Sequence, residues 1–144
     1  METATMGKVL VTARIENLSD LYNVRQGLLT DDKVRRIDVT DAMVDTGAMM
    51  LCMPKALIER LGLQRHRTRR MRTPSGNVET GVYEVVRLTV EGRDCAVEVL
   101  EVQDDCPVFI GQIPLEALDF MVDMVNRKLV GNPEHHGEFM VDVF

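Results

Sequence analysis

Apolar and polar residues alternate with a period of two over several stretches of the chain, which is the spacing of a strand with one buried face. The alternation is clearest over residues 83–90 and resumes over residues 95–102, and Gly92-Arg93 between them predicts a hairpin turn. Residues 8–17 are rich in β-branched and aliphatic side chains. Over residues 34–44 the alternation gives way to a continuous apolar run, which indicates a strand that enters the core. The chain is therefore predicted to be mainly β.

Proline and glycine mark two short predicted helices. Residues 54–61 begin with Pro54, continue with good helix formers and are followed by Gly62, where a C-cap residue belongs. Residues 113–118 repeat this arrangement more briefly. The chain lacks the strand–helix–strand rhythm of a parallel sheet, so a small closed or half-closed β-barrel with one or two short helices is the predicted fold.

The remaining segments show less regular patterns. Residues 16–32 predict a short helix or an irregular excursion. Beyond residue 119, short strands are predicted, with breaks at residues 126–127 and 131–133.

Composition and charge narrow the class of protein. With 144 residues, 45% of them hydrophobic and 28% charged, the chain is predicted to form a single folded domain over residues 1–144. A net charge of -6 argues against a dedicated nucleic-acid-binding protein, which is usually basic. No apolar stretch approaches the roughly 20 residues that cross a bilayer, and the one before Arg14 is too short for a secretory signal. We therefore expect no nucleic-acid partner and no membrane association.

The cysteines and histidines show no pattern of a metal site. Cys52, Cys95 and Cys106 are odd in number, widely spaced and without a CxxC pair, which favours free thiols in a reducing compartment, the cytoplasm. His66 stands alone, and the pair His135-His136 has no cysteine nearby. No metal and no cofactor is predicted, and no Cys-His-Asn set indicates a thiol protease.

A carboxylate stands where an apolar run ends, because Asp45-Thr46-Gly47 lies between Val44 and Ala48. Burial of that charge costs free energy, so the position of Asp45 needs an explanation. The three residues form either a structural turn, which suits Asp and Gly, or a loop that places the carboxylate for catalysis.

Two further sequence patterns follow the Asp-Thr-Gly motif along the chain. Thr-Pro-Ser-Gly-Asn at residues 73–77 lies between two strand-like segments, and Pro-Val-Phe-Ile-Gly at residues 107–111 precedes the short helix at residues 114–118. With the Asp-Thr-Gly motif, they resemble the retroviral-type (retropepsin-like) aspartic proteases and their small cellular and bacterial relatives. In that family the first pattern is the flap and the second a glycine-bearing loop. The resemblance covers about residues 33–123 and implies the small closed β-barrel of these proteases.

The resemblance also implies an activity, that of an aspartic endopeptidase. In this family two carboxylates share one proton and activate a water that attacks the peptide bond. The catalytic residues carried over are Asp45, Thr46, whose hydroxyl ties the two catalytic loops together, and Gly47, which lets the backbone approach closely. Because the chain has a single such motif, the second carboxylate is expected from an identical chain across a two-fold axis. The expected assembly is a homodimer with one active site, a polypeptide substrate, and residues 138–144 in the interface.

Substrate contacts are implied at two places. Ala48 and Met49 lie beside the catalytic loop, and Ser75, Gly76 and Asn77 form the flap tip, which opens to admit a polypeptide and closes to exclude water.

Two positions depart from the family pattern. Met49 and Gln112 stand where many retropepsins carry an acid and an arginine that pair within the subunit. Both partners are replaced together, so no charge is left unpaired. Met49, Met50 and Met53 then give an apolar pocket floor, or else serve as adaptable core residues.

Two alternatives stay open at this stage. A catalytically silent dimer of the same fold, with Asp45 in a structural turn, would act as a protein-binding or assembly module. The basic stretch at residues 65–72 is interpreted as a solvated strand that leads to the flap, and the alternative is that its arginines steer an acidic protein substrate toward the cleft.

Overall fold

The computed structural model describes residues 8–143, and strands dominate that range. The strands are β1 (Val9–Asn17), β2 (Arg36–Val44), β3 (Leu51–Pro54), β4 (Arg65–Thr73), β5 (Gly76–Val90), β6 (Arg93–Val102), β7 (Phe109–Ile110), β8 (Phe120–Asp123) and β9 (Lys128–Gly131). The helices are α1 (Leu18–Arg25), α2 (Lys55–Arg60) and α3 (Gln112–Ala117), with single 3-10 turns η1 (Asp31–Lys33) and η2 (Pro133–His135). The mainly β prediction is confirmed, and the two helices expected from Pro54 and Pro114 are present.

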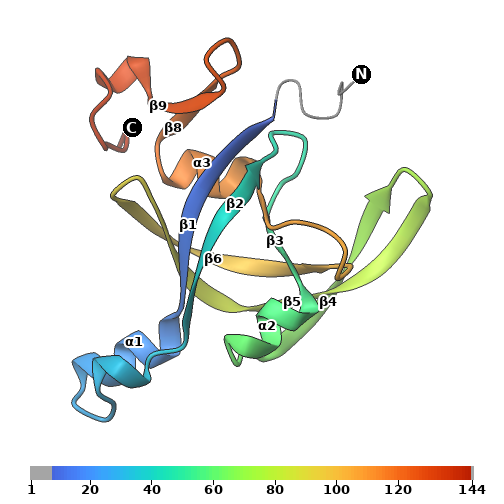
Figure 1. The fold of residues 1–144 in the computed structure, drawn as a ribbon, viewed down its shortest axis with the longest axis vertical. Coiled ribbons are helices and arrows are strands. Elements are labelled where there is room, and N and C mark those ends of the chain that lie inside the picture. Colours follow the sequence, from blue (N-terminus) through green and yellow to red (C-terminus); the bar gives the residue numbers. More distant parts are fainter. Residues whose placement is uncertain (1–7, 144) are drawn as a thin grey trace.

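The main sheet closes on itself. Its strands are hydrogen-bonded in the order β1-β2-β7-β3-β6-β5-β4, and β1 also pairs with β5, so β4 alone lies outside the ring (Figure 1). Closure depends on Arg14–Asn17 of β1, which pair with residues 86–89 of β5. A closed sheet leaves no free edge within the ring, and this architecture agrees with the predicted retropepsin-like barrel.

The hydrophobic core fills the interior of the ring. Alternate residues of β1 point inward, and Ala13 and Ile15 are fully buried there. Leu88 from β5 and Ile110 from β7 join them without exposure to solvent. Burial of each such leucine or isoleucine side chain stabilises the fold by about 2 kcal/mol relative to leaving it exposed. The apolar residues that alternate along the sequence are thus the residues that point into the core.

A buried carboxylate lies at the junction of β1, β2 and β5. Glu16 is 2% exposed, and its two oxygens accept hydrogen bonds from Arg36 at 2.9 Å and from Arg87 at 2.7 Å. A buried charge is tolerated when it is paired and hydrogen-bonded in this way. The ion pairs therefore connect three strands at the place where the ring closes.

The excursion between β1 and β2 is an ordered helix. Asn17 caps α1 by accepting a hydrogen bond from the Asp20 amide at 3.0 Å, and its side-chain amide donates to the Leu61 carbonyl at 2.8 Å. Asp20 is 5% exposed and accepts hydrogen bonds from the amide and guanidinium of Arg35. Of the two interpretations given to residues 16–32, the short helix is correct.

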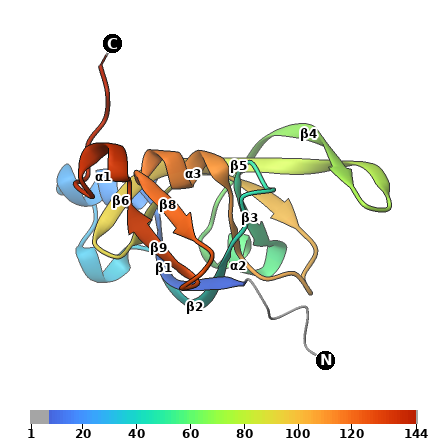
Figure 2. The same cartoon turned by 90° about the horizontal axis from the view of Figure 1, so that it is seen from above.

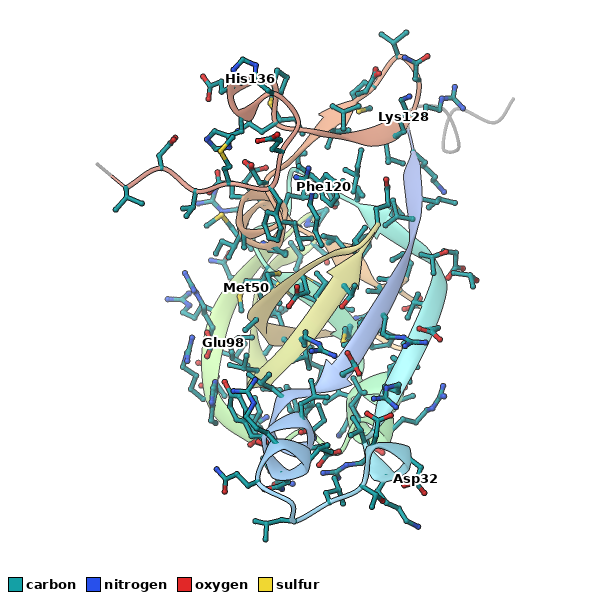
Figure 3. All side chains as sticks on the ribbon, turned by 90° about the vertical axis from the view of Figure 1, so that its left-hand side faces the viewer. Asp32, Met50, Glu98, Phe120, Lys128 and His136 are labelled. Carbon is teal, nitrogen blue, oxygen red and sulfur yellow. The ribbon has the colours of Figure 1, made fainter. Side chains whose placement is uncertain are left out.

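The chain after α3 packs across one end of the ring (Figures 2 and 3). Asp119 holds this segment, because its carboxylate accepts hydrogen bonds from Asn132 at 3.1 Å, His135 at 2.6 Å and the Met140 amide at 3.2 Å. Burial pushes the pKa of Asp119 up, but these hydrogen bonds outweigh it and the pKa is lowered. Arg93 adds donors to the Leu118 and Asp119 carbonyls.

Two predictions for secondary structure need correction. The last apolar alternation does not form a strand, since residues 138–143 have no regular structure and instead contact Asp119 and Arg93. The strand β3 was not predicted at all, because its four residues belong to an apolar run that leads directly into α2. The expected break at residues 126–127 is confirmed, and the second break begins one residue later than expected, because Gly131 is the last residue of β9.

Candidate functional site

The Asp45 loop begins where β2 leaves the sheet. β7 lies parallel to β2 and fixes this point, because the Met43 amide donates to the Val108 carbonyl at 2.8 Å and the Asp45 amide donates to the Ile110 carbonyl at 3.0 Å. Asp45 is half-buried, whereas Thr46 and Gly47 are exposed. The carboxylate therefore stands at the surface of the ring on a backbone that the core strands hold.

The loop also forms a local turn. The Gly47 amide donates to the Asp45 Oδ1 at 2.9 Å, and the Ala48 amide donates to the Asp45 carbonyl at 3.1 Å. A Cβ at position 47 would lie 3.2 Å from the same Oδ1, so any side chain there would crowd the carboxylate. The turn therefore also orients the carboxylate, and among residues 8–143 no hydrogen bond is made to Asp45 Oδ2.

A second loop interlocks with the first through three backbone hydrogen bonds. The amides of Gly111, Gln112 and Ile113 donate to the carbonyls of Met50, Ala48 and Met49 at 3.0, 2.8 and 2.8 Å. A Cβ at Gly111 would lie 2.6 Å from the Ala48 and Met50 oxygens and 2.7 Å from the Met49 carbonyl carbon. Glycine is required there by space, because its φ of -89° is one that any residue adopts. The two glycine motifs seen in the sequence are therefore brought into direct contact.

The predicted flap is a hairpin of β4 and β5 that projects from the ring (Figure 1). Thr73 pairs with Gly76 across the two-residue turn Pro74-Ser75, and the Thr73 hydroxyl donates to the Gly76 carbonyl at 2.7 Å. Gly76 has a φ of +123°, a conformation that side chains disfavour. Ser75, Gly76 and Asn77 are all exposed at the tip.

A small apolar cluster connects the base of the predicted flap to the Asp45 loop. It is separate from the main core and consists of Met50, Cys52, Val82 and Leu100, with Met71, Val102 and Phe109 packed against it. Because Met50 follows the Asp45 loop and Met71 and Val82 belong to the flap strands, this cluster sets the distance between flap and loop.

The predicted methionine floor is correct only in part. Met49 is 60% exposed beside the loop and Met50 belongs to the cluster below the flap. Met53 is fully buried in the main core, where β3 is paired on both sides, so it cannot line a pocket.

Residues 33–123 match the family model described as aspartyl protease. The chain belongs to the aspartyl protease family, of the retropepsin-like type. The matched range runs through β8 and includes the Asp45 loop, the flap and Gly111, which confirms the resemblance drawn from the sequence. No curated protein matches the chain in sequence.

Burial changes the acidity of Cys52, which lies near the Asp45 loop. Burial, and then the charges of Asp45 and Cys106, raise the pKa of Cys52 to about 11. The Cys52 thiol is therefore neutral at physiological pH and acts as a small apolar group in the cluster below the flap. Throughout the described residues the three cysteines are free thiols, as predicted.

The sequence did not predict that Met71 and Arg69 lie on the side of the flap that faces Met50. Both were treated as part of a basic, solvated strand, yet Met71 packs in the cluster and Arg69 lines a depression with Met50. The available signal was Met71 itself, an apolar residue within the basic stretch, at even spacing from Arg69.

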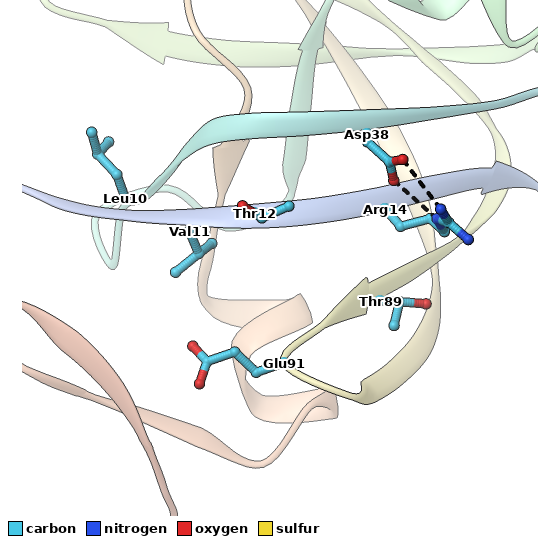
Figure 4. Close-up of a pocket in the computed structure, with 7 residues that line it drawn as sticks. All are labelled: Leu10, Val11, Thr12, Arg14, Asp38, Thr89 and Glu91. Atoms are coloured by element: carbon cyan, nitrogen blue, oxygen red, sulfur yellow. Dashed lines mark hydrogen bonds and ion pairs between the residues drawn. The ribbon is translucent and has the colours of Figure 1, made fainter.

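Other places in the described structure lack the features of a site. The larger depression lies beside β1, where the ion pair of Arg14 with Asp38 at 2.9 Å forms one wall and Leu10 and Glu91 form others (Figure 4). Asp45 does not line it. Residues 8–143 contain no group of three or more His, Cys, Asp or Glu side chains placed to hold a metal, and no helix there is long and apolar enough to cross a membrane.

Proposed function

We propose that the chain is an aspartic endopeptidase that hydrolyses peptide bonds as a homodimer, with Asp45 from each protomer as the catalytic dyad. One observation carries the proposal. The Asp45 carboxylate lies at the surface on a loop that seven hydrogen bonds from backbone amides hold in place, two to residues 108 and 110, three from the Gly111 loop and two within the turn itself. A rigidly held carboxylate is what a catalytic acid or base requires, because the reaction depends on its exact position.

The chemistry needs two such carboxylates. Two like charges within a few ångströms cannot both ionise comfortably, so the pair shares one proton at working pH. The ionised carboxylate takes a proton from a water held between the two, and the protonated one donates to the carbonyl oxygen of the scissile bond. Asp45 has no second aspartate beside it in its own loop, so the partner comes from a two-fold related copy.

Thr46 and Gly47 support this arrangement. Within residues 8–143 the Thr46 side chain makes no hydrogen bond, and it is exposed, which leaves its hydroxyl for the copy of the loop across the axis. Gly47 keeps the space beside the Asp45 Oδ1 open. Both features favour a loop that meets its own copy.

We propose that the substrate lies between the Asp45 loop and the flap. Ala48 and Met49 would contact it from below, and the exposed tip residues Ser75, Gly76 and Asn77 would cover it. The apolar Met49 side chain, 60% exposed, favours apolar substrate side chains next to the scissile bond. Residues 1–144 would act as one protease domain, and the free thiols favour the cytoplasm.

The test compares Asp45→Asn with the control Asp41→Asn, an exposed aspartate of β2 that makes no ion pair in the described residues. Each protein is incubated with a peptide library and the products are identified by mass spectrometry, while sedimentation velocity gives the assembly state. We expect Asp45→Asn to lower cleavage by at least about 10³-fold and to leave folding and dimerisation intact, because it removes general acid–base catalysis and a like-charge contact. Asp41→Asn should cleave as the parent does.

Two results would contradict the proposal. Equal cleavage by Asp45→Asn and the parent would show that another group or a contaminant acts. A folded parent dimer without any cleavage would favour the alternative, a silent dimer that serves as a binding or assembly module with Asp45 in a structural turn.

A further inference from the structure

The flap strand has a charge opposite to that of the rest of the chain. Residues 65–82 contain five arginines and one glutamate, a net charge of +4, in a chain whose total is -6, so the other residues together carry -10. All five arginines lie in β4, and the first six residues of this strand are exposed. The hairpin that projects from the ring is therefore the positive part of an acidic protein (Figure 1).

Most of this positive charge is not neutralised within the chain. Arg67 pairs with both oxygens of Glu98 at 2.6 Å, and His66 contacts the same carboxylate at 2.7 Å. The hydrogen bonds from Arg67 hold the pKa of Glu98 below its usual range, so Glu98 is ionised and paired. Among the described residues no carboxylate lies within 4.0 Å of the other four arginines, which are Arg65, Arg69, Arg70 and Arg72.

The strand register places one of these four toward the catalytic loop. Arg69 pairs with Thr80 and Met71 with Val78, so Arg69 and Met71 lie on the same face of the hairpin. Met71 packs against the cluster that contains Met50. Arg70 falls on the opposite face, since successive residues of a strand alternate. The Arg69 guanidinium is thus directed to the side of the flap that faces the Asp45 loop.

A depression lies at this position. Arg69 lines it together with Met50 from the end of the catalytic loop, Ile113 and Pro114 from α3, and Glu98 from β6. Met50 and Glu98 lie on the same side of the molecule in Figure 3. Because Glu98 is already paired with Arg67, the cation of Arg69 is the unpaired charge of a depression whose other walls are mainly apolar. Such a site suits the aliphatic stem and terminal carboxylate of an acidic side chain.

We propose that Arg69, supported by Arg65, Arg70 and Arg72, makes this protease select polypeptide substrates with acidic side chains near the scissile bond. The inference rests on the proposed function and adds the substrate class. A protein rather than a nucleic acid is the favoured partner, because residues 65–82 contain no Phe, Tyr or Trp side chain on which a base could stack. The arginines outside the depression raise the local concentration of acidic chains, an effect that salt screens.

The test separates recognition from catalysis. Two synthetic peptide pools are made that differ only in a glutamate or a glutamine at the positions flanking a randomised centre. Binding of each pool to the uncleavable Asp45→Asn protein is measured by fluorescence anisotropy at low and high salt, and cleavage of each pool by the parent gives kcat/KM. Arg69→Gln is compared with the control Arg25→Gln, an exposed arginine of α1 at the far end of the molecule from the flap (Figure 1).

The expected result is a preference for the glutamate pool of about tenfold at low salt that shrinks at high salt, because one charge-assisted contact has about that effect. Arg69→Gln should remove this preference and leave the glutamine pool bound and cleaved as before, whereas Arg25→Gln should keep the preference. Equal binding of both pools, an unchanged preference in Arg69→Gln, or tighter binding of a single-stranded oligonucleotide than of the glutamate pool would overturn the inference. If the proposed function is wrong but the inference is right, the parent protein will cleave neither pool, while Asp45→Asn still binds the glutamate pool more tightly.

Discussion

Gly111→Ala tests whether the interlock of the two loops positions Asp45. The added methyl group would lie 2.6 Å from two backbone oxygens, whereas ordinary contacts begin at 3.4 Å, so the loops must separate by about 0.8 Å. Backbone atoms of Ala48, Met49 and Met50 are the obstacle, and no side chain can rotate to make room. The backbone conformation at position 111 suits alanine, so the effect is steric alone.

The cost follows from what the separation breaks. Three backbone hydrogen bonds join the loops, and at about 1 kcal/mol each their loss gives about 3 kcal/mol. For a chain of this length that is a fall in Tm of about 10 °C, measured by thermal unfolding followed by circular dichroism. Because the shift approaches 1 Å at the proposed catalytic group, Asp45, kcat should fall by about 10²-fold at temperatures where the variant is folded.

Gly27→Ala is the matched control. Nothing lies within 4 Å of a Cβ at position 27, but its φ of +76° is unfavourable for alanine, so the variant should lose about 1 kcal/mol and keep its activity. If Gly111→Ala melts within about 2 °C of the parent and cleaves peptides at the parent rate, the loops relax freely and the interlock does not position Asp45.

Two further predictions concern titratable groups. The hydrogen bond to Asp119, followed by the one to Asp142, raises the pKa of His135 above its usual value of 6.5, so the stability that this contact adds is fully present below about pH 6 and is lost as the pH rises through the raised pKa. His135→Gln should therefore lower Tm more at about pH 5.5 than at about pH 8.5, and an equal loss at both would refute the ion pair. Burial raises the pKa of Cys52 and Cys95 to about 11, so in the native protein a disulfide reagent at about pH 8 should modify Cys106 first, as peptide mapping would show.

The parts of the fold that local pattern decides could be predicted from the sequence. The β5–β6 hairpin was predicted from alternation around Gly92-Arg93, and the pairing of Val90 with Arg93 places the turn one residue earlier, at Glu91-Gly92. The helix α2 ends before Gly62, whose φ of +66° is the conformation that its glycine favours. The loop around Asp45 could be predicted because the three consecutive residues Asp45, Thr46 and Gly47 determine its local geometry.

Other parts depend on contacts between distant residues and have no local signal. The strand β3 exists because parallel pairing with β6 and antiparallel pairing with β7 stabilise four residues at the end of an apolar run, the last of which, Pro54, was assigned to the start of a helix. Ring closure needs β1 beside β5, some seventy residues apart. Residues 138–143 have the apolar pattern of a strand but form none, and the hydrogen bond from the Met140 amide to Asp119 holds the chain there instead.

The proposed dimer and the proposed substrate preference constrain each other. A two-fold axis through the dyad would place one depression with Arg69 on each side of the scissile bond, since every feature of one protomer is repeated in the other. A polypeptide has a direction and cannot present identical groups to both, so one acidic side chain would satisfy one depression and leave its copy open. Acidic residues on either side of the bond would then be acceptable, and the apolar surface at Met49, repeated next to the axis, would select the residues at the bond itself. Such a specificity would depend more on the charge of the substrate than on its exact sequence, in line with the positive charge of residues 65–82 in an otherwise acidic chain.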